Sequence, residues 1–189
     1  MSSATRSKEI FKSLVSIWKT FSTVAGEDQA KYLAFSLLFV KYVSDVWRDQ
    51  YAQCHSQFGD SADMIAELSR VSRFSMPRAA DFQRLLDSRF EPGNAQRIDA
   101  ALSAIEDGNR EAFNLGSEGL FGAISFGSIC LGANERLDDI LIQVLEQFAN
   151  PSLDLRPSHL NDQRIVPDAC QAFLLHTAAQ GKQKAAFQP

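Results

Sequence analysis

Thiol and imidazole side chains are the groups in this sequence that could form a nucleophile and its base. Cys170 and His176 stand six residues apart, which on an α-helix places them about 120° from a shared face. A nucleophile and its base must lie within hydrogen-bond reach, so this spacing favours a cysteine on a helix face over a catalytic pair. Cys54 and His55 are adjacent and diverge on a helix. His159 stands in a polar stretch without a second ligand nearby, and we therefore predict no catalytic and no metal-ligating residue.

Catalytic motifs do not occur elsewhere in the sequence. It contains no HExxH, no GxSxG and no glycine-rich phosphate loop after a strand. The stretch NPSL at 150–153 begins like the Asn/Asp-Pro-Pro-aromatic turn in which amino-methylating enzymes hold a flipped base. Ser152 and Leu153 replace the second proline and the ring, so the stacking surface is missing and the stretch is interpreted as a turn. We therefore expect that this chain alone is not an enzyme and holds no cofactor.

A cluster of arginines is the one charge pattern that could bind DNA. Five of them fall within twenty residues, with only Asp81 and Asp87 as acids in the same stretch. Guanidinium groups in a loop and on one helix face can span phosphates. The alternative is a solvated surface with local ion pairs, and both interpretations stay open. The candidate DNA-binding residues are Arg70, Arg73, Arg78, Arg84 and Arg89.

The composition is that of an ordinary globular domain. The 189 residues are 45% hydrophobic and 22% charged, and the net charge of −4 means that DNA binding would need a local basic face. The three cysteines are odd in number and form no CxxC pair, which favours reduced thiols in the cytoplasm. The longest apolar run, 33–40, is much shorter than the ~20 residues of a membrane span, so we expect a soluble protein without a membrane partner.

The stretch LLFVKYVSDVW, residues 37–47, is apolar except for one charged pair. Lys41 and Asp45 lie one helical turn apart, on a strip that the apolar faces leave to water or to a polar partner. A solvated strip is the favoured interpretation. The alternative is a functional pair, in which Lys41 and Asp45 contact a partner protein.

Hydrophobic periodicity predicts a mainly α-helical, bundle-like single domain. The second predicted helix has two apolar faces and should lie in the middle, with neighbours on both sides. Five glycines between 110 and 132 predict a long loop with at most a short strand pair. The predicted helices are 7–25, 28–58, 60–70, 78–88, one from an Asn94 cap to Gly108, one from an Asn134 cap to Ala149, and 162–179, interrupted near Pro167.

Several segments together resemble the N-terminal helical domain of the modification subunit of type I restriction-modification systems. The stretch LVSIWKTF is similar to that family's opening helix, and YLAFSLLFVKYVSDVW to its aromatic and leucine-rich stretch with LFLKYISD. FSMPRAADFQRLL and IDAALSAIEDGN resemble its Phe-x-x-Pro segment and the helix that follows. The segment from LFGAISF to RPSHL then follows in the right order, so the resemblance covers nearly the whole chain.

The resemblance implies a partnership with other proteins. In this family the helical domain precedes a catalytic domain that binds S-adenosylmethionine and methylates adenine at N6. Two modification subunits join one specificity subunit around DNA, so the implied partners are the specificity subunit, DNA, a second modification subunit and the restriction subunit. The implied function is an interaction domain that contributes to assembly and to holding DNA, in an enzyme that as a whole is a site-specific adenine methyltransferase.

The end of the chain departs from the family pattern. Residues 185–189 read AAFQP where the family has Gly-Glu-Phe-Tyr-Thr-Pro, a segment associated with the cofactor site. We therefore expect a helical domain at 1–181, followed by a boundary at 182–189 before an absent catalytic domain. The alternatives are a stand-alone helical DNA-binding or regulatory module, and a non-functional remnant of an interrupted methylase gene.

Overall fold

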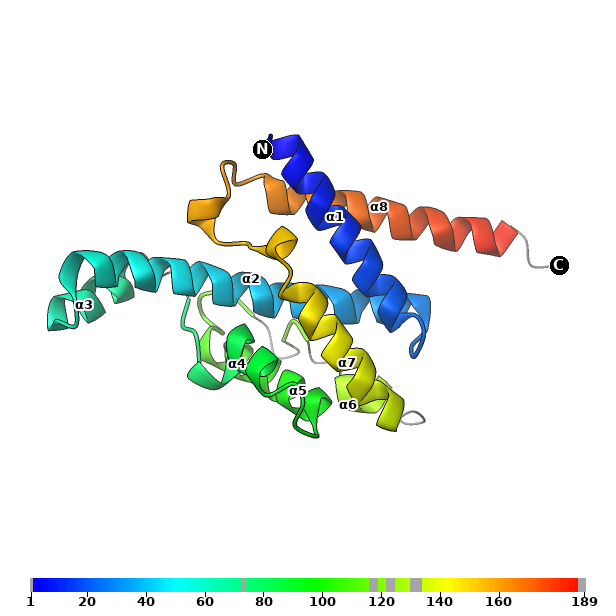
Figure 1. The fold of residues 1–189 in the computed structure, drawn as a ribbon, viewed down its shortest axis with the longest axis horizontal. Coiled ribbons are helices and arrows are strands. Elements are labelled where there is room, and N and C mark those ends of the chain that lie inside the picture. The colour runs from blue at the N-terminus through cyan, green and yellow to red at the C-terminus, as the bar shows by residue number, and fades with distance from the viewer. Residues whose placement is uncertain (1, 73, 116–118, 122–124, 130–133, 187–189) are drawn as a thin grey trace.

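The computed structural model describes residues 2–72, 74–115, 119–121, 125–129 and 134–186. Within these ranges the chain forms α-helices and short 3₁₀ turns and contains no strand (Figure 1), which confirms the predicted mainly α-helical fold. The glycine-containing loop predicted at 110–132 lies partly outside the described residues. The helices are α1 (Ser3–Phe21), α2 (Glu27–Phe58), α3 (Ala62–Val71), α4 (Phe82–Asp87), α5 (Asn94–Gly108), α6 (Phe126–Ile129), α7 (Asn134–Phe148) and α8 (Ile165–Ala186), and the 3₁₀ turns are Arg78–Ala80, Pro151–Leu153 and Pro157–His159.

The long helix α2 is the central element of the fold. Figure 1 shows it running across the molecule, with α1 and α8 on one side and α4 and α5 on the other. Its apolar residues are buried towards both sides, so the predicted position of this helix between neighbours is confirmed. Only its C-terminal part extends beyond this core, where it is followed by α3. The fully buried apolar residues of α2 include Leu33, Ala34, Leu37 and Val40.

Helix α1 presents one apolar stripe to α2, α7 and α8. Its inner residues recur at steps of three and four, as expected for a helix with one buried face. Trp18 meets Phe173 of α8 edge to face, with ring centroids 6.4 Å apart, and donates a hydrogen bond to the carbonyl of Glu27 at 3.1 Å. Phe21 packs in the same way on Phe126 of α6 at 6.0 Å. Aromatic contacts therefore join three helices around the end of α1.

Two predicted helix features are corrected by the structure. Helix α8 is not interrupted near Pro167, because a proline in the first turn lies where no intrahelical N–H bond is needed. Asn94 is not the cap of α5 but its first residue, preceded by Gly93 at φ +90°. Its buried amide donates to the carbonyl of Arg89 at 2.7 Å and thus closes the turn between α4 and α5.

Candidate functional site

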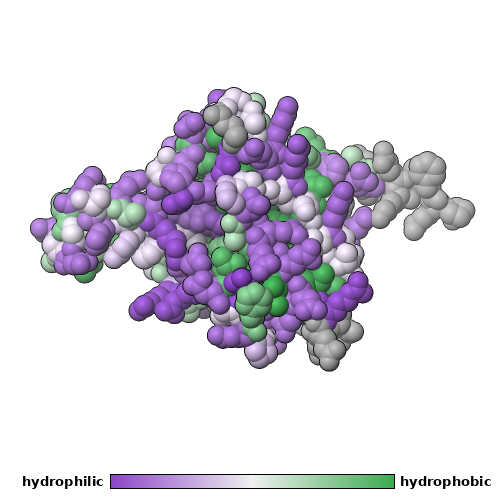
Figure 2. Space-filling view, viewed as in Figure 1, coloured by the Kyte–Doolittle hydropathy of each residue, from purple (hydrophilic) through white to green (hydrophobic). Residues whose placement is uncertain are grey.

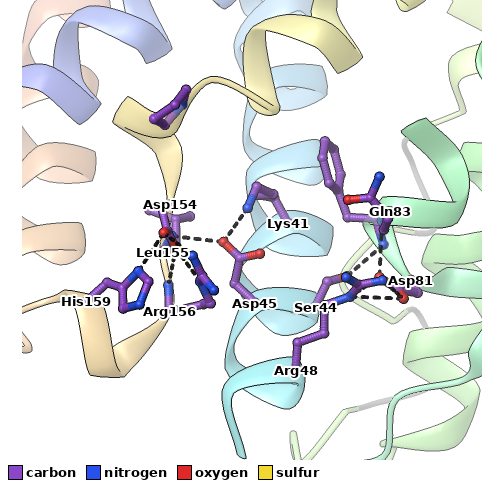
Figure 3. Close-up of polar contacts among 12 residues, drawn as sticks. Lys41, Ser44, Asp45, Arg48, Asp81, Gln83, Asp154, Leu155, Arg156 and His159 are labelled. Carbon is purple, nitrogen blue, oxygen red and sulfur yellow. Dashed lines mark hydrogen bonds and ion pairs between the residues drawn. The ribbon is translucent and has the colours of Figure 1, made fainter. Parts of the chain in front are cut away.

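Lys41 and Asp45 are buried, so the prediction of a solvated strip is wrong. Each residue is only 8% exposed, and the lysine Nζ donates to Oδ2 of Asp45. The same carboxylate oxygen accepts a hydrogen bond at 2.8 Å from the backbone N–H of Leu155 (Figure 3). The ammonium also lies 5.4 Å from the ring centroid of Phe82. The pair is therefore an internal junction, and its contact with a partner protein remains a prediction.

Asp49, one turn further along α2, extends this junction. Its carboxylate accepts from the backbone N–H of Ser158 at 2.8 Å and from the Ser158 hydroxyl at 2.5 Å. Asp49 is buried, with 7% of its surface exposed. A segment without regular secondary structure cannot pair all of its own backbone N–H groups. A carboxylate that accepts hydrogen bonds from these groups satisfies them. Asp45 and Asp49 therefore hold residues 149–160, here called the return segment, against α2.

The turn at the start of the return segment is closed by its own side chains and by α1. The Asn150 side chain accepts from the N–H of Ser152 at 2.9 Å, which confirms the interpretation of NPSL as a turn. Arg6 of α1 donates to the carbonyls of Pro151 and Asp154 at 3.0 and 3.1 Å. The return segment is thus bonded to both α1 and α2.

On its other side the same part of α2 holds the start of α4. The hydroxyl of Ser44 accepts from the backbone N–H of Phe82 at 2.9 Å, a bond that is buried. Arg48 forms a two-fold pair with Asp81, with Nε 3.0 Å from Oδ1 and Nη2 2.7 Å from Oδ2 (Figure 3). Asp81 in turn caps α4 by accepting from the N–H of Gln83 at 3.1 Å. Two turns of α2 therefore position two segments that are far apart in the sequence.

A third group of charges lies within the return segment itself. Arg156 donates to both oxygens of Asp154 at 2.8 and 2.6 Å, and Nδ1 of His159 lies 2.7 Å from Oδ2 (Figure 3). The hydrogen bonds from Arg156, together with the contact of His159, hold the pKa of the Asp154 carboxyl well below its usual range. The same pairing raises the pKa of Arg156. His159 therefore has a carboxylate neighbour that the sequence did not reveal.

These charges line a polar cleft between α2, α4 and the return segment. Its volume is about 470 Å³, and Arg48, Asp49 and Arg156 are among its walls. Its cations Lys41, Arg48 and Arg156 each bond to a carboxylate. The charged side chains of the cleft therefore serve to join segments of the chain.

The five candidate arginines do not form one free surface. Arg70 pairs with Glu67 at 2.7 Å on α3, and Arg89 pairs with Glu146 of α7 at 2.9 Å. Arg78 and Arg84 are exposed and have no bonded partner among the described residues. Arg73 lies outside the described residues. Local ion pairs thus account for two of the five, and DNA binding by the cluster remains a prediction.

The thiol and imidazole of α8 lie in different surroundings. Burial raises the pKa of the Cys170 thiol to about 11, so it stays protonated at neutral pH. The ring of His176 packs edge-on against Phe11 and Trp18, with centroids 5.7 and 6.2 Å apart. In the described part of the chain, no three or more His, Cys, Asp and Glu side chains gather in a way that could hold a metal ion.

An apolar surface groove was not predicted from the sequence. It lies between α2 and α8, has a volume of about 420 Å³ and exposes almost no polar surface, and we call it the α2–α8 groove. Tyr32 and Leu120 on its rim are 53% and 51% exposed. The aromatic stripe of α2 was the sequence signal that could have indicated this groove. Periodicity alone assigns such a stripe to packing inside the domain, because it does not distinguish a buried face from an exposed apolar one. The groove is lined by Tyr32, Phe35, Ser36, Leu38, Phe39, Tyr42, Leu120, Phe121, Val166 and Cys170.

Comparison with known proteins places the chain in a family. None of the described helices combines the length and the apolar character that crossing a membrane requires. No curated protein and no solved structure is significantly similar to the chain. The family model of the HsdM N-terminal domain matches residues 8–148, which include α2 with Lys41 and Asp45. The chain therefore belongs to the family of N-terminal domains of type I restriction-modification modification subunits.

Proposed function

We propose that this chain is the interaction domain of a type I DNA-methylase subunit. It docks on the specificity subunit and helps to hold DNA while a separate catalytic domain, with S-adenosylmethionine as methyl donor, methylates adenine at N6. A second modification subunit and the restriction subunit are further partners in such an assembly. The family match supports the part of this proposal that concerns a type I modification subunit.

The α2–α8 groove is the observation that carries the docking role. Its walls are almost wholly apolar, and rings such as Tyr32 and Tyr42 remain 53% and 39% exposed on its rim. Exposed apolar surface of this kind marks a protein contact, and tyrosines are enriched among residues that dominate binding energies. The polar junction of α2 supports the same role because it fixes the helix that carries six of the groove residues.

Substitution of the groove tyrosines tests the docking role. We expect the double variant Tyr32→Ala/Tyr42→Ala to bind purified specificity subunit at least ~10-fold more weakly than the unchanged chain, because burial of the two rings is lost. Isothermal titration calorimetry measures the two dissociation constants. Tyr51→Ala is the matched control, since Tyr51 is 37% exposed on α2 but lies outside the groove. Equal affinities of the double variant and the control contradict the proposal.

A further inference from the structure

The exposed face of α1 carries a row of lysines that are too widely spaced in the sequence to form a charge cluster. Lys8, Lys12 and Lys19 are all exposed, and none has a bonded partner among the described residues. At about 100° per residue they fall within roughly 40° of one another around the helix axis. We call these three residues the lysine ridge. They lie nearly opposite the buried stripe, so the packing of α1 directs them to solvent.

The charge of α1 contrasts with that of the whole chain. The helix has four cations against one acid, Glu9, and this acid is paired with Arg6 at 3.4 Å. The chain as a whole has a net charge of −4. The basic face is therefore local, which is the condition that DNA binding by an acidic domain requires.

The neighbours of the ridge are mostly polar. Thr5 and Ser16 are exposed beside the lysines, and Ala4 is the single exposed apolar residue of α1. Figure 2 looks onto the side of the molecule that α1 occupies, and hydrophilic residues predominate over this helix. A helix that binds a membrane surface needs apolar residues beside its cations, so this face is suited to an aqueous polyanion instead.

The length of the ridge matches a run of phosphates. The eleven residue steps from Lys8 to Lys19 rise about 16 Å along the helix, which corresponds to about five base-pair steps of B-DNA. Ammonium groups act as point charges on phosphates and do not need the planar geometry of a base edge. We propose that the lysine ridge of α1 contacts the phosphate backbone of duplex DNA without reading its sequence. The proposal rests on the proposed function, because it gives the DNA-holding role a surface.

The salt dependence of DNA binding tests this proposal. Fluorescence anisotropy of a labelled 30-base-pair duplex of arbitrary sequence measures the affinity of the 189-residue chain between 50 and 200 mM salt. The triple variant Lys8→Gln/Lys12→Gln/Lys19→Gln should bind at least ~10-fold more weakly at 50 mM salt, and its slope of log affinity against log salt should be shallower by about 1 per lysine. The triple Lys→Arg variant, which keeps the charges, should bind like the unchanged chain.

A second variant distinguishes the ridge from the predicted arginine cluster. Arg78→Gln/Arg84→Gln removes the two cluster arginines that are exposed and unpaired within the described residues. Unchanged binding by the lysine variant, with loss in the arginine variant, overturns the ridge proposal but leaves the DNA-holding role intact. If the unchanged chain binds no duplex even at 50 mM salt, the DNA-holding role and the ridge fail together. If the lysine variant loses only the specificity subunit, the ridge is a protein contact and the proposal is wrong.

Discussion

Lys41 and Asp45 differ from Asp28 and Lys31, an ion pair in the first turns of α2, in what surrounds them. The Asp28 side chain is 90% exposed, whereas that of Asp45 is 11% exposed and also accepts a backbone N–H from the return segment. Periodicity correctly predicted that both charges share a strip of the helix. Periodicity could not predict that the pair is buried, because the return segment, which covers it, follows about 110 residues later in the sequence. Local sequence therefore revealed the pair but not its role.

Removal of Asp45 should be costly at this residue scale. Asp45→Ala leaves the Lys41 ammonium buried without its partner, and we expect the free energy of unfolding to fall by about 3–5 kcal/mol. Asp28→Ala, which breaks the exposed pair, should lower it by less than about 1 kcal/mol. Urea denaturation monitored by circular dichroism measures both values. Similar losses in the two variants are incompatible with a buried junction.

Asp154 should make the domain sensitive to acid. Its folded pKa is lowered, so its ionised form stabilises the fold above the ordinary Asp pKa of 3.8, and this contribution is lost as the pH falls towards the folded value. Asp154→Asn should therefore flatten the dependence of the unfolding free energy on pH below about pH 4. Urea unfolding at pH 5.5 and pH 3 measures this dependence. Asp63→Asn, at an exposed acid without a bonded partner in the described part of the chain, is the control and should keep the dependence of the unchanged chain.

At the scale of elements, apolar periodicity predicted the main helices well because each buries a stripe. Ends were less accurate: α1 starts at Ser3, where the Ser2 hydroxyl accepts from the N–H of Thr5 at 3.3 Å, a cap that apolar spacing does not reveal. Helix α8 lies beyond the matched family region of 8–148, yet it packs along α1. The fully buried ring of Phe173 lies 5.2 Å from that of Phe35, which connects α8 to α2. Helix α8 therefore belongs to the same core.

Truncation of Phe173 tests the attachment of α8. Phe173→Ala removes a ring that is 0% exposed, and we expect a loss of about 3–5 kcal/mol in the free energy of unfolding. Leu175→Ala on the same helix, at a residue that is 66% exposed, should change it by no more than about 0.5 kcal/mol. Differential scanning calorimetry of the two variants gives the comparison. A small effect at both positions means that α8 does not contribute to the core.

At the scale of the whole molecule, the candidate surfaces are built from residues that no local motif unites. The α2–α8 groove joins an aromatic stripe of α2 to Val166 and Cys170, more than 120 residues away. The lysine ridge joins residues spread over a helix, and only the helical phase shows that they face one way. The arginine cluster illustrates the opposite case, because sequence neighbours such as Arg84 and Arg89 differ in whether they are paired. Closeness in the sequence was therefore a poorer guide to which charged side chains are exposed and unpaired than position around the helix axis.

The bonds of α2 to the return segment bear on how the domain can fold during synthesis. Asp45 and Asp49 are made early, but their backbone partners at Leu155 and Ser158 emerge from the ribosome more than 100 residues later. Until then these carboxylates have to remain hydrated, because the backbone N–H groups that bond them in the folded domain do not yet exist. A polypeptide that stopped at residue 148, where the family match ends, would never receive those partners. The smallest unit that folds completely must therefore reach past Ser158.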